Sequence, residues 1–156
     1  MKDIIKTIII LMICCSCSII SKGIVKSDGY EKRLQTIIKS IIVEDKLTIE
    51  QIKNAIPKTE DEYFIFYSYT EKDEKNNHAF YELNNLIFNN AMNNEKGILK
   101  SYLLLSEFVD GEYAESYFED VEAVIIKNKQ IFCKLFSQLP TKKVRRLVKL
   151  HSKYCN

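Results

Sequence analysis

The feature that most constrains the fold is the spacing of apolar residues, which recur at intervals of three and four along most of the chain. The clearest stripe consists of five aliphatic residues: Leu34, Ile37, Ile38, Ile41 and Ile42. Residues at these intervals lie on one face of a helix, and an apolar face must be buried against another element. The periodicity therefore predicts an all-α fold.

The same spacing predicts further helices as far as the end of the chain. Their expected ranges are 49–56, 78–93, 95–109, 112–126, 131–139 and 141–154. The 156 residues include four glycines and two prolines, which is too few for a turn-rich β architecture. Thr48 can cap the first of these helices, and Pro57 follows its end.

The segment YFIFYSYT at residues 63–70 is ambiguous, because its aromatic and β-branched residues suit a strand. However, Thr59 and Glu62 form a capping-box pattern. In this pattern the threonine hydroxyl accepts from the glutamate amide, and the glutamate carboxylate accepts from the threonine amide. Since no partner strand is predicted elsewhere, we expect a short helix here that is buried on most sides.

The expected helices are joined by short turns, which place consecutive helices antiparallel. Their pairing into units at 79–109 and 112–139 resembles a short HEAT-type α-solenoid. A compact up-and-down helical bundle accounts for the same pattern. Both arrangements consist of antiparallel helical hairpins, and the sequence leaves the choice between them open.

The N-terminus has the pattern of an export signal. Lys2 and Lys6 precede the apolar run TIIILMICCSC at residues 7–17. Extended to Ile20, the run has 14 residues, which is shorter than the roughly 18–20 apolar residues that span a bilayer. A charged start followed by a short apolar run is typical of a bacterial signal peptide, and a permanent transmembrane anchor is the weaker interpretation.

Three cysteines, Cys14, Cys15 and Cys17, lie where this run ends. The pattern resembles the lipobox of bacterial lipoproteins, in which a cysteine after a small residue is acylated and becomes the new N-terminus. Cys17 fits best because Ser16 precedes it, and Cys15 is the alternative. Cys14 departs from the usual pattern, since Leu, Val or Ile is commoner three residues before the acylated cysteine. A plain secretory signal and a buried apolar helix are the competing interpretations.

The resemblance implies a signal peptide at residues 1–16, a lipid-anchored tether at 17–28 and a single all-α domain at 29–156. Two or more acyl chains hold a protein stably at a lipid bilayer. Some lipoproteins of this kind carry an acidic signal after the cysteine for display on the cell surface, and here no carboxylate precedes Asp28. The resemblance therefore implies an anchor in a bacterial membrane that faces the periplasm.

Residue types that bind metals are sparse. His78 and His151 lie 73 residues apart, and neither has a Cys, His or carboxylate at a recognised ligand spacing. We expect His78 to be solvated and His151 to be half-buried in the apolar stripe of the last helix. The sequence predicts no metal site and no cofactor.

Cys133 and Cys155 are the remaining thiols, in a compartment that permits disulfides. If helices at 131–139 and 141–154 fold back about Pro140, Cys155 lies about 10 Å beyond the residue opposite Cys133. A disulfide requires Cα atoms within about 7 Å of each other. The sequence therefore predicts two free thiols, with Cys133 packed in the core.

Charged residues are segregated towards the C-terminus. Residues 107–122 contain seven carboxylates and no Lys or Arg, whereas residues 142–153 contain six Lys or Arg and no acid. The acidic helical face is typical of a solvated surface. The basic residues can pair with the acidic helix, contact anionic lipid headgroups or dock a partner, and pairing within the fold is favoured. The candidate partner-binding residues are Glu112, Glu115, Glu119, Glu122, Lys142, Arg145, Arg146 and Lys149.

The sequence contains no phosphate-binding loop, nucleophile elbow or dinucleotide fingerprint. We therefore expect a protein that is not an enzyme: a membrane-anchored lipoprotein that binds another protein of the cell envelope. An immunity-type inhibitor of an envelope-acting toxin is the first alternative, and a small envelope hydrolase is the second. Export from the cytoplasm disfavours a nucleic-acid partner.

Overall fold

The computed structural model describes the backbone of residues 24–155 and the side chains of residues 29–155 other than Lys96 and Glu112. Every regular element in this part of the chain is a helix, as predicted. The leader and both lipidation candidates, Cys15 and Cys17, lie outside the described residues. The first described helix begins within the stretch that the sequence assigns to the tether.

The helices follow one another along the chain with short connections. The α-helices are α2 (Ile24–Ile42), α3 (Ile49–Ala55), α4 (Glu60–Tyr67), α5 (Glu74–Met92), α6 (Ile98–Leu105), α7 (Glu112–Lys127), α8 (Lys129–Phe136), α9 (Thr141–Val144) and α10 (Val148–Cys155). Short 3-10 turns lie between them at η2 (Ser68–Glu71), η3 (Glu95–Gly97) and η4 (Arg145–Leu147).

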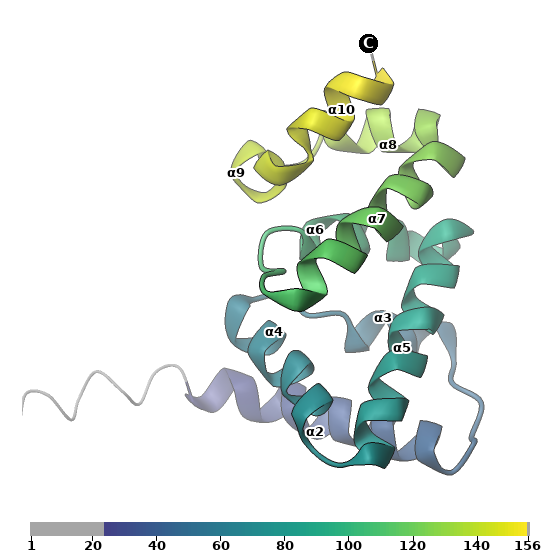
Figure 1. The fold of residues 1–156 in the computed structure, drawn as a ribbon, viewed down its shortest axis with the longest axis vertical. Helices are drawn as coiled ribbons and strands as arrows, with labels where there is room; N and C mark the ends of the chain where they lie inside the picture. Colours follow the sequence, from purple (N-terminus) through teal and green to yellow (C-terminus); the bar gives the residue numbers. More distant parts are fainter. Residues whose placement is uncertain (1–23, 156) are drawn as a thin grey trace, which may run out of the picture.

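Helix α5 runs through the middle of the molecule and contacts α2, α3, α6 and α7. Helices α2, α3 and α4 lie towards one end, and the pair of α8 and α10 lies at the other, beside the short α9 (Figure 1). In a solenoid each repeat contacts only its neighbours. Because α5 also contacts α2, from which α3 and α4 separate it along the chain, the fold is a compact helical arrangement rather than an extended array.

One cluster of buried apolar residues extends from Tyr30 in α2 to Leu147 in η4. Four of the five residues in the first predicted stripe are buried, while Ile42 at the end of α2 is 38% exposed. The predicted stripe of α5 is buried throughout and consists of Phe80, Leu83, Ile87 and Ala91. The apolar periodicity therefore identified the core-facing sides of these two helices.

The ambiguous segment 63–70 is helical, as α4 followed by η2. Its Tyr63, Phe66 and Tyr69 side chains are buried in the core. Rings from α4 and α5 meet there, since the centroids of Phe66 and Phe80 lie 5.0 Å apart. Burial against neighbouring helices thus accounts for an aromatic content that in isolation also suits a strand.

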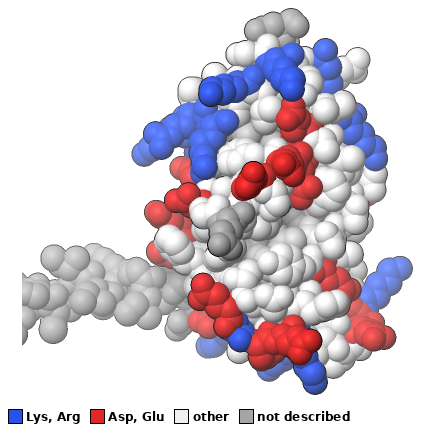
Figure 2. Space-filling view, in the orientation of Figure 1, with Lys and Arg blue, Asp and Glu red and all other residues white. Residues whose placement is uncertain are grey.

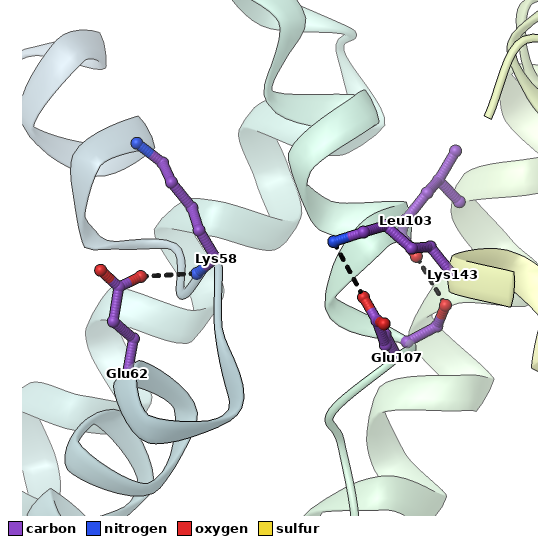
Figure 3. Close-up of polar contacts among 6 residues, drawn as sticks. Lys58, Glu62, Leu103, Glu107 and Lys143 are labelled. Atoms are coloured by element: carbon purple, nitrogen blue, oxygen red, sulfur yellow. Dashed lines mark hydrogen bonds and ion pairs between the residues drawn. The ribbon is translucent and has the colours of Figure 1, made fainter. Parts of the chain in front are cut away.

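The helix caps differ in one detail from those predicted. Thr48 and Gln51 form a complete capping box at the start of α3. The Thr59 hydroxyl accepts from the Glu62 amide at 3.2 Å, as predicted. The prediction for the Glu62 carboxylate was wrong, because it accepts from the Lys58 amide at 2.7 Å instead of from Thr59 (Figure 3).

Helix α5 begins at Glu74, four residues before the predicted start at His78. The Asp73 carboxylate accepts a hydrogen bond from the Asn76 amide at 3.0 Å and caps this earlier start. The next predicted helix is divided into η3 and α6. The polar residues 74–77 are therefore already helical, although they extend no apolar stripe.

The prediction of two free thiols was wrong. Cys133 in α8 and Cys155 in α10 form a disulfide, with their Cα atoms 5.6 Å apart. Both residues are half-buried beside the core. The disulfide joins the last helix of the chain to α8 and closes a loop with a sequence separation of 22 residues.

The error arose from the assumption of one continuous helix at 141–154. Instead, α9 ends at Val144, whose φ of −120° departs from helical geometry, and η4 separates it from α10. The residues of this connection carry α10 into a different register beside α8. His151 stacks on Phe136, so the two helices are antiparallel and Cys155 lies opposite Cys133.

Candidate functional site

A groove lies between α5 and the C-terminal end of α2 with its loop to α3. Two adjoining hollows of about 490 and 450 Å³ are both lined by Ile41, Glu44 and Glu82. A third hollow of about 540 Å³ continues along α5 and shares Glu74 and His78 with the first. We call the three hollows together the α2–α5 groove.

The floor of the α2–α5 groove is apolar and its rim is acidic. Ile41, Ile52 and Ala79 line it from buried positions. Beside it, Ile42 and Val43 are 38% and 65% exposed. The charged residues that line the first two hollows are all exposed and comprise four carboxylates and two lysines: Glu44, Asp45, Glu74, Glu82, Lys46 and Lys75. The groove thus combines apolar surface with net negative charge.

Glu44 lines both of these hollows from a strained backbone position. Its φ is 60°, in the left-handed region where glycine is usual because a Cβ atom clashes with the backbone. Across this turn the Asp45 amide donates to the Ser40 carbonyl at 2.9 Å, the pattern of a Schellman cap.

The acidic face predicted on α7 is present in part. Glu115 and Glu119 are exposed, whereas the side chain of Glu112 lies outside the described residues. Figure 2 shows basic side chains gathered at the end that α8, α9 and α10 form, and acidic side chains from the middle of the molecule to the opposite end, where some basic ones also lie. The basic end is therefore the more clearly segregated of the two charges on this face.

Glu122, the fourth residue of the predicted acidic face, contacts α10. Its carboxylate lies 2.6 Å from the Lys153 ammonium and also accepts a hydrogen bond from the Tyr154 hydroxyl. These hydrogen bonds, with that of Lys153 the larger contribution, hold the pKa of Glu122 below its usual range. Glu122 therefore fastens α10 to α7 and is not free to bind a partner.

The predicted basic residues do not form one helical stripe, because α9, η4 and α10 are separate elements. Lys149 is exposed on α10. Four other cations line a small hollow of about 80 Å³ together with Glu107: Lys142, Lys143, Arg145 and Arg146. We call these four cations the basic connector.

Two members of the basic connector contact the body of the fold. The Lys143 ammonium lies 3.2 Å from the Glu107 carboxylate (Figure 3). Arg146 donates to the Val109 carbonyl, and its guanidinium lies 4.8 Å from the centre of the Phe118 ring. Two ion pairs therefore join the acidic and basic segments: Glu107 with Lys143, and Glu122 on α7 with Lys153 on α10.

The histidines occupy the surroundings that the sequence predicts. His78 is exposed, and it lines the α2–α5 groove. His151 is half-buried, and its ring centroid lies 4.1 Å from that of Phe136. Within the described part of the chain, no group of three or more His, Cys, Asp or Glu residues is placed to hold a metal ion.

The most strongly perturbed titratable groups are buried tyrosines. Burial raises the pKa of Tyr30, Tyr102 and Tyr117 above the ordinary tyrosine value. The hydroxyls of Tyr30 and Tyr117 donate to the carbonyls of Ala55 and Tyr102, each at 2.6 Å. Burial also raises the pKa of the Asp120 carboxyl. The tyrosine hydroxyls link helices across the core and remain protonated at neutral pH.

Sequence reasoning missed the α2–α5 groove. Glu74, His78 and Glu82 recur at intervals of four on α5, and that polar stripe was a usable signal. Glu44 gave no such signal, because its place in the groove depends on the turn after α2. The approach of that turn to α5 is a tertiary contact between segments far apart in the sequence.

The chain matches no protein-family model, no curated protein and no solved structure. Among residues 24–155, no helix combines the length and apolar character that crossing a membrane requires.

Proposed function

We propose that this protein is a lipid-anchored, non-catalytic interaction module of a bacterial cell envelope. Acylated Cys17 holds it at a membrane, facing the periplasm, and the α2–α5 groove binds a segment of another envelope protein. The groove is the observation that carries the binding function, because it joins an apolar floor to an acidic rim. The anchor depends on the lipobox-like leader.

Two independent features support export. The leader has a charged start, a short apolar run and a cysteine after a small residue. The disulfide between Cys133 and Cys155 adds to this, because disulfides form and persist in oxidising compartments such as the periplasm and are rare in the cytosol.

The chemistry of the groove selects its partner. The rim has more carboxylates than lysines: Glu44, Asp45, Glu74 and Glu82 against Lys46 and Lys75. Electrostatic complementarity therefore favours a cationic segment. The buried floor of Ile41, Ile52 and Ala79 favours apolar side chains on one face of that segment. An amphipathic helix that carries Lys or Arg beside its apolar stripe meets both requirements.

The anchor is tested by intact mass of the protein recovered from membranes. We expect the natural chain to lack residues 1–16 and to carry acyl chains. Cys17→Ala should abolish both changes, and the matched Cys15→Ala variant should be processed normally. A full-length chain recovered from the cytosol with its leader attached contradicts the proposal.

The groove is tested with two designed 18-residue amphipathic helical peptides, one of Leu and Lys and one of Leu and Glu. Isothermal titration calorimetry uses the oxidised mature chain from Ser18. We expect the Leu/Lys peptide to bind and the Leu/Glu peptide not to bind. Glu44→Gln with Glu82→Gln should weaken binding by about threefold to tenfold, since each exposed ion pair contributes little.

The matched control removes the same charge from α7. Glu115→Gln with Glu119→Gln leaves the α2–α5 groove intact, so we expect the peptide affinity to remain within about twofold of the natural chain. If the α7 variant loses more peptide affinity than the groove variant, the peptide binds to the acidic face of α7 and not to the α2–α5 groove. Equal binding of the two peptides contradicts a charge-selective groove.

An immunity-type inhibitor of an envelope-acting toxin is the second candidate function. The exposed Glu115 and Glu119 on α7 favour it, because an acidic face suits a cationic toxin surface. A toxin gene next to this one, and protection of cells by the tethered protein, support this function. If the α7 variant still protects cells from the toxin, Glu115 and Glu119 do not bind the toxin.

A small envelope hydrolase is the third candidate. It requires several polar groups that converge in one pocket. We expect no turnover of generic ester, glycoside or phosphate substrates by the mature chain. Turnover that survives repeated purification contradicts a purely non-catalytic function.

A further inference from the structure

The charge of the chain is divided sharply along its sequence. Residues 127–156 contain nine Lys or Arg and no Asp or Glu, whereas the whole chain contains 23 basic and 21 acidic residues. The remaining 126 residues therefore have an excess of acid. Apart from Lys127 at the end of α7, these cations lie in the unit formed by α8, α9, η4 and α10, in which the disulfide between Cys133 and Cys155 joins α8 to α10. We call this unit the C-terminal cap.

Several cations of the C-terminal cap are already paired, and two in the basic connector are not. Lys153 pairs with Glu122 and Lys143 with Glu107. Lys142 and Arg145 are exposed, and their side chains form no ion pair or hydrogen bond with the described residues. Both line the hollow of about 80 Å³ with Lys143 and Arg146, so four cations and the single carboxylate of Glu107 surround this hollow.

The basic connector lies on the side of the molecule where α2 begins. Figure 1 places the start of α2 and the short α9 along the same long edge, and Figure 2 shows Lys and Arg side chains standing out from that edge. The contacts agree, because α4 packs on α2 and Glu60 at the start of α4 shares a hollow with Arg145 and Arg146.

We propose that the basic connector binds the anionic phospholipid headgroups of the membrane that holds the tether, and thereby orients the domain on its long edge. The placement beside that membrane rests on the proposed anchor at Cys17, whereas the affinity for anionic headgroups does not. Cys17 and Ile24 are separated by seven residues, so the start of α2 lies within about 25 Å of the anchor. The start of α2 is therefore held near the membrane surface.

The lining of the hollow favours headgroups over a protein partner. Its five residues are all charged, whereas the centre of a protein interface is depleted of charge and rich in aromatic and apolar side chains. Each Lys or Arg near an anionic membrane adds to the attraction without a shaped apolar pocket. Phosphate groups in a fluid leaflet can rearrange to meet Lys142 and Arg145.

Nearby carboxylates limit the strength of this contact. Glu60, Glu107 and Asp110 line a hollow of about 440 Å³ with Arg145 and Arg146. At physiological salt the attraction is therefore weak for a free domain, and it becomes effective when the tether raises the local concentration of headgroups. The contact sets the orientation of the domain, while the acyl chains hold it at the membrane.

The test measures sedimentation of the oxidised mature chain from Ser18 with lipid vesicles. This chain keeps every described residue and lacks acyl chains, so its result is independent of the anchor. We expect binding to phosphatidylglycerol vesicles in about 0.02 M salt, none to phosphatidylcholine vesicles, and release at about 0.5 M salt. Lys142→Gln with Arg145→Gln should lower the affinity by about 25-fold, at about fivefold for each charge.

The control variant, Lys39→Gln with Lys100→Gln, removes two exposed cations from α2 and α6. We expect it to bind within about twofold of the natural chain, and both variants should keep the natural melting temperature. Equal loss in the two variants, or binding to phosphatidylcholine, overturns the proposal. Salt-resistant binding of a short single-stranded DNA without vesicle binding also overturns it and identifies a nucleic-acid surface.

Discussion

At the scale of single residues, Glu44 adds a negative charge to the groove rim but adopts a backbone conformation that lowers the stability of the fold. A left-handed conformation costs about 1–2 kcal/mol for a residue with a Cβ atom, and Glu44 adopts it with φ of 60°. The residue gains no hydrogen bond through its side chain among the described residues, yet it lines two hollows of the α2–α5 groove. Its carboxylate therefore contributes to the rim at a cost in stability.

Glu44→Gly should stabilise the fold and weaken peptide binding in the same protein. Glycine adopts the left-handed conformation without a clash, so we expect the free energy of unfolding to rise by about 0.5–1 kcal/mol. Urea denaturation followed by circular dichroism measures this change. Calorimetry with the Leu/Lys peptide should show a lower affinity, because one rim carboxylate is lost.

Glu44→Gln separates the two effects. It keeps a Cβ atom and therefore the strain, so its stability should stay within about 0.5 kcal/mol of the natural chain. Its loss of peptide affinity should match that of the glycine variant. If the glycine variant is less stable than the natural chain, the turn after α2 is not strained and the argument from Glu44 fails.

Residue-scale features could be predicted where they depend on near neighbours in the sequence. The hydroxyls of Thr48 and Thr59 cap α3 and α4 as expected, because each needs only an amide three residues later. The Glu62 carboxylate accepts a hydrogen bond from the Lys58 amide instead of from the Thr59 amide. That choice depends on the backbone path before α4, which the capping pattern does not specify.

At the scale of elements, α10 depends on few attachments. None of its residues is fully buried, although Leu150, Tyr154 and Cys155 pack against the core from half-buried positions. Its specific contacts include the disulfide to α8, the stacking of His151 on Phe136 and the bonds from Lys153 and Tyr154 to Glu122. The position of the C-terminal cap is therefore sensitive to the disulfide.

Cys133→Ser with Cys155→Ser should destabilise the protein by about 3 kcal/mol, the effect of opening a loop of this length in the unfolded chain. Hydrogen exchange should localise the change, with faster exchange of amides in α10 than in α5. Reduction of the natural chain should reproduce the variant, whereas reductant should leave the variant unchanged. If the α10 amides of the variant exchange as slowly as those of the natural chain, the disulfide does not hold α10 in place.

Long periodic helices were predictable and interrupted ones were not. The stripe of α5 is sustained over four core residues, so its existence followed from spacing alone. The helix expected at 141–154 is apolar at regular intervals too, but Val144 leaves helical geometry. That single break changed the register of α10 beside α8, and with it the distance between Cys133 and Cys155.

At the scale of the whole molecule, α2 separates two surfaces of opposite charge. Its 19 residues extend about 28 Å at 1.5 Å per residue. It begins on the long edge that α9 shares (Figure 1), and its last turn borders the α2–α5 groove. In the proposed arrangement, headgroups meet the basic connector on one side, and the groove stays open to a partner on the other.

The sequence indicated the charge segregation but not this arrangement. The acidic and basic segments are evident from counts along the chain. Which cations remain unpaired depends on tertiary contacts, such as those of Lys143 with Glu107 and Arg146 with Val109. The groove requires α2 and α5 to meet, and no local pattern specifies how two helices separated by two others pack.

The two surfaces should act independently. At about 0.15 M salt the screening length is about 8 Å, much shorter than α2, and distant sites change free energies additively. We therefore expect Lys142→Gln with Arg145→Gln to leave peptide affinity within about twofold, and Glu44→Gln with Glu82→Gln to leave vesicle affinity within the same limit. A chain with all four changes should lose as much vesicle affinity as the first variant and as much peptide affinity as the second. A loss of peptide affinity in the first variant, measured by calorimetry without vesicles, shows that groove and connector form one binding surface and contradicts their separation.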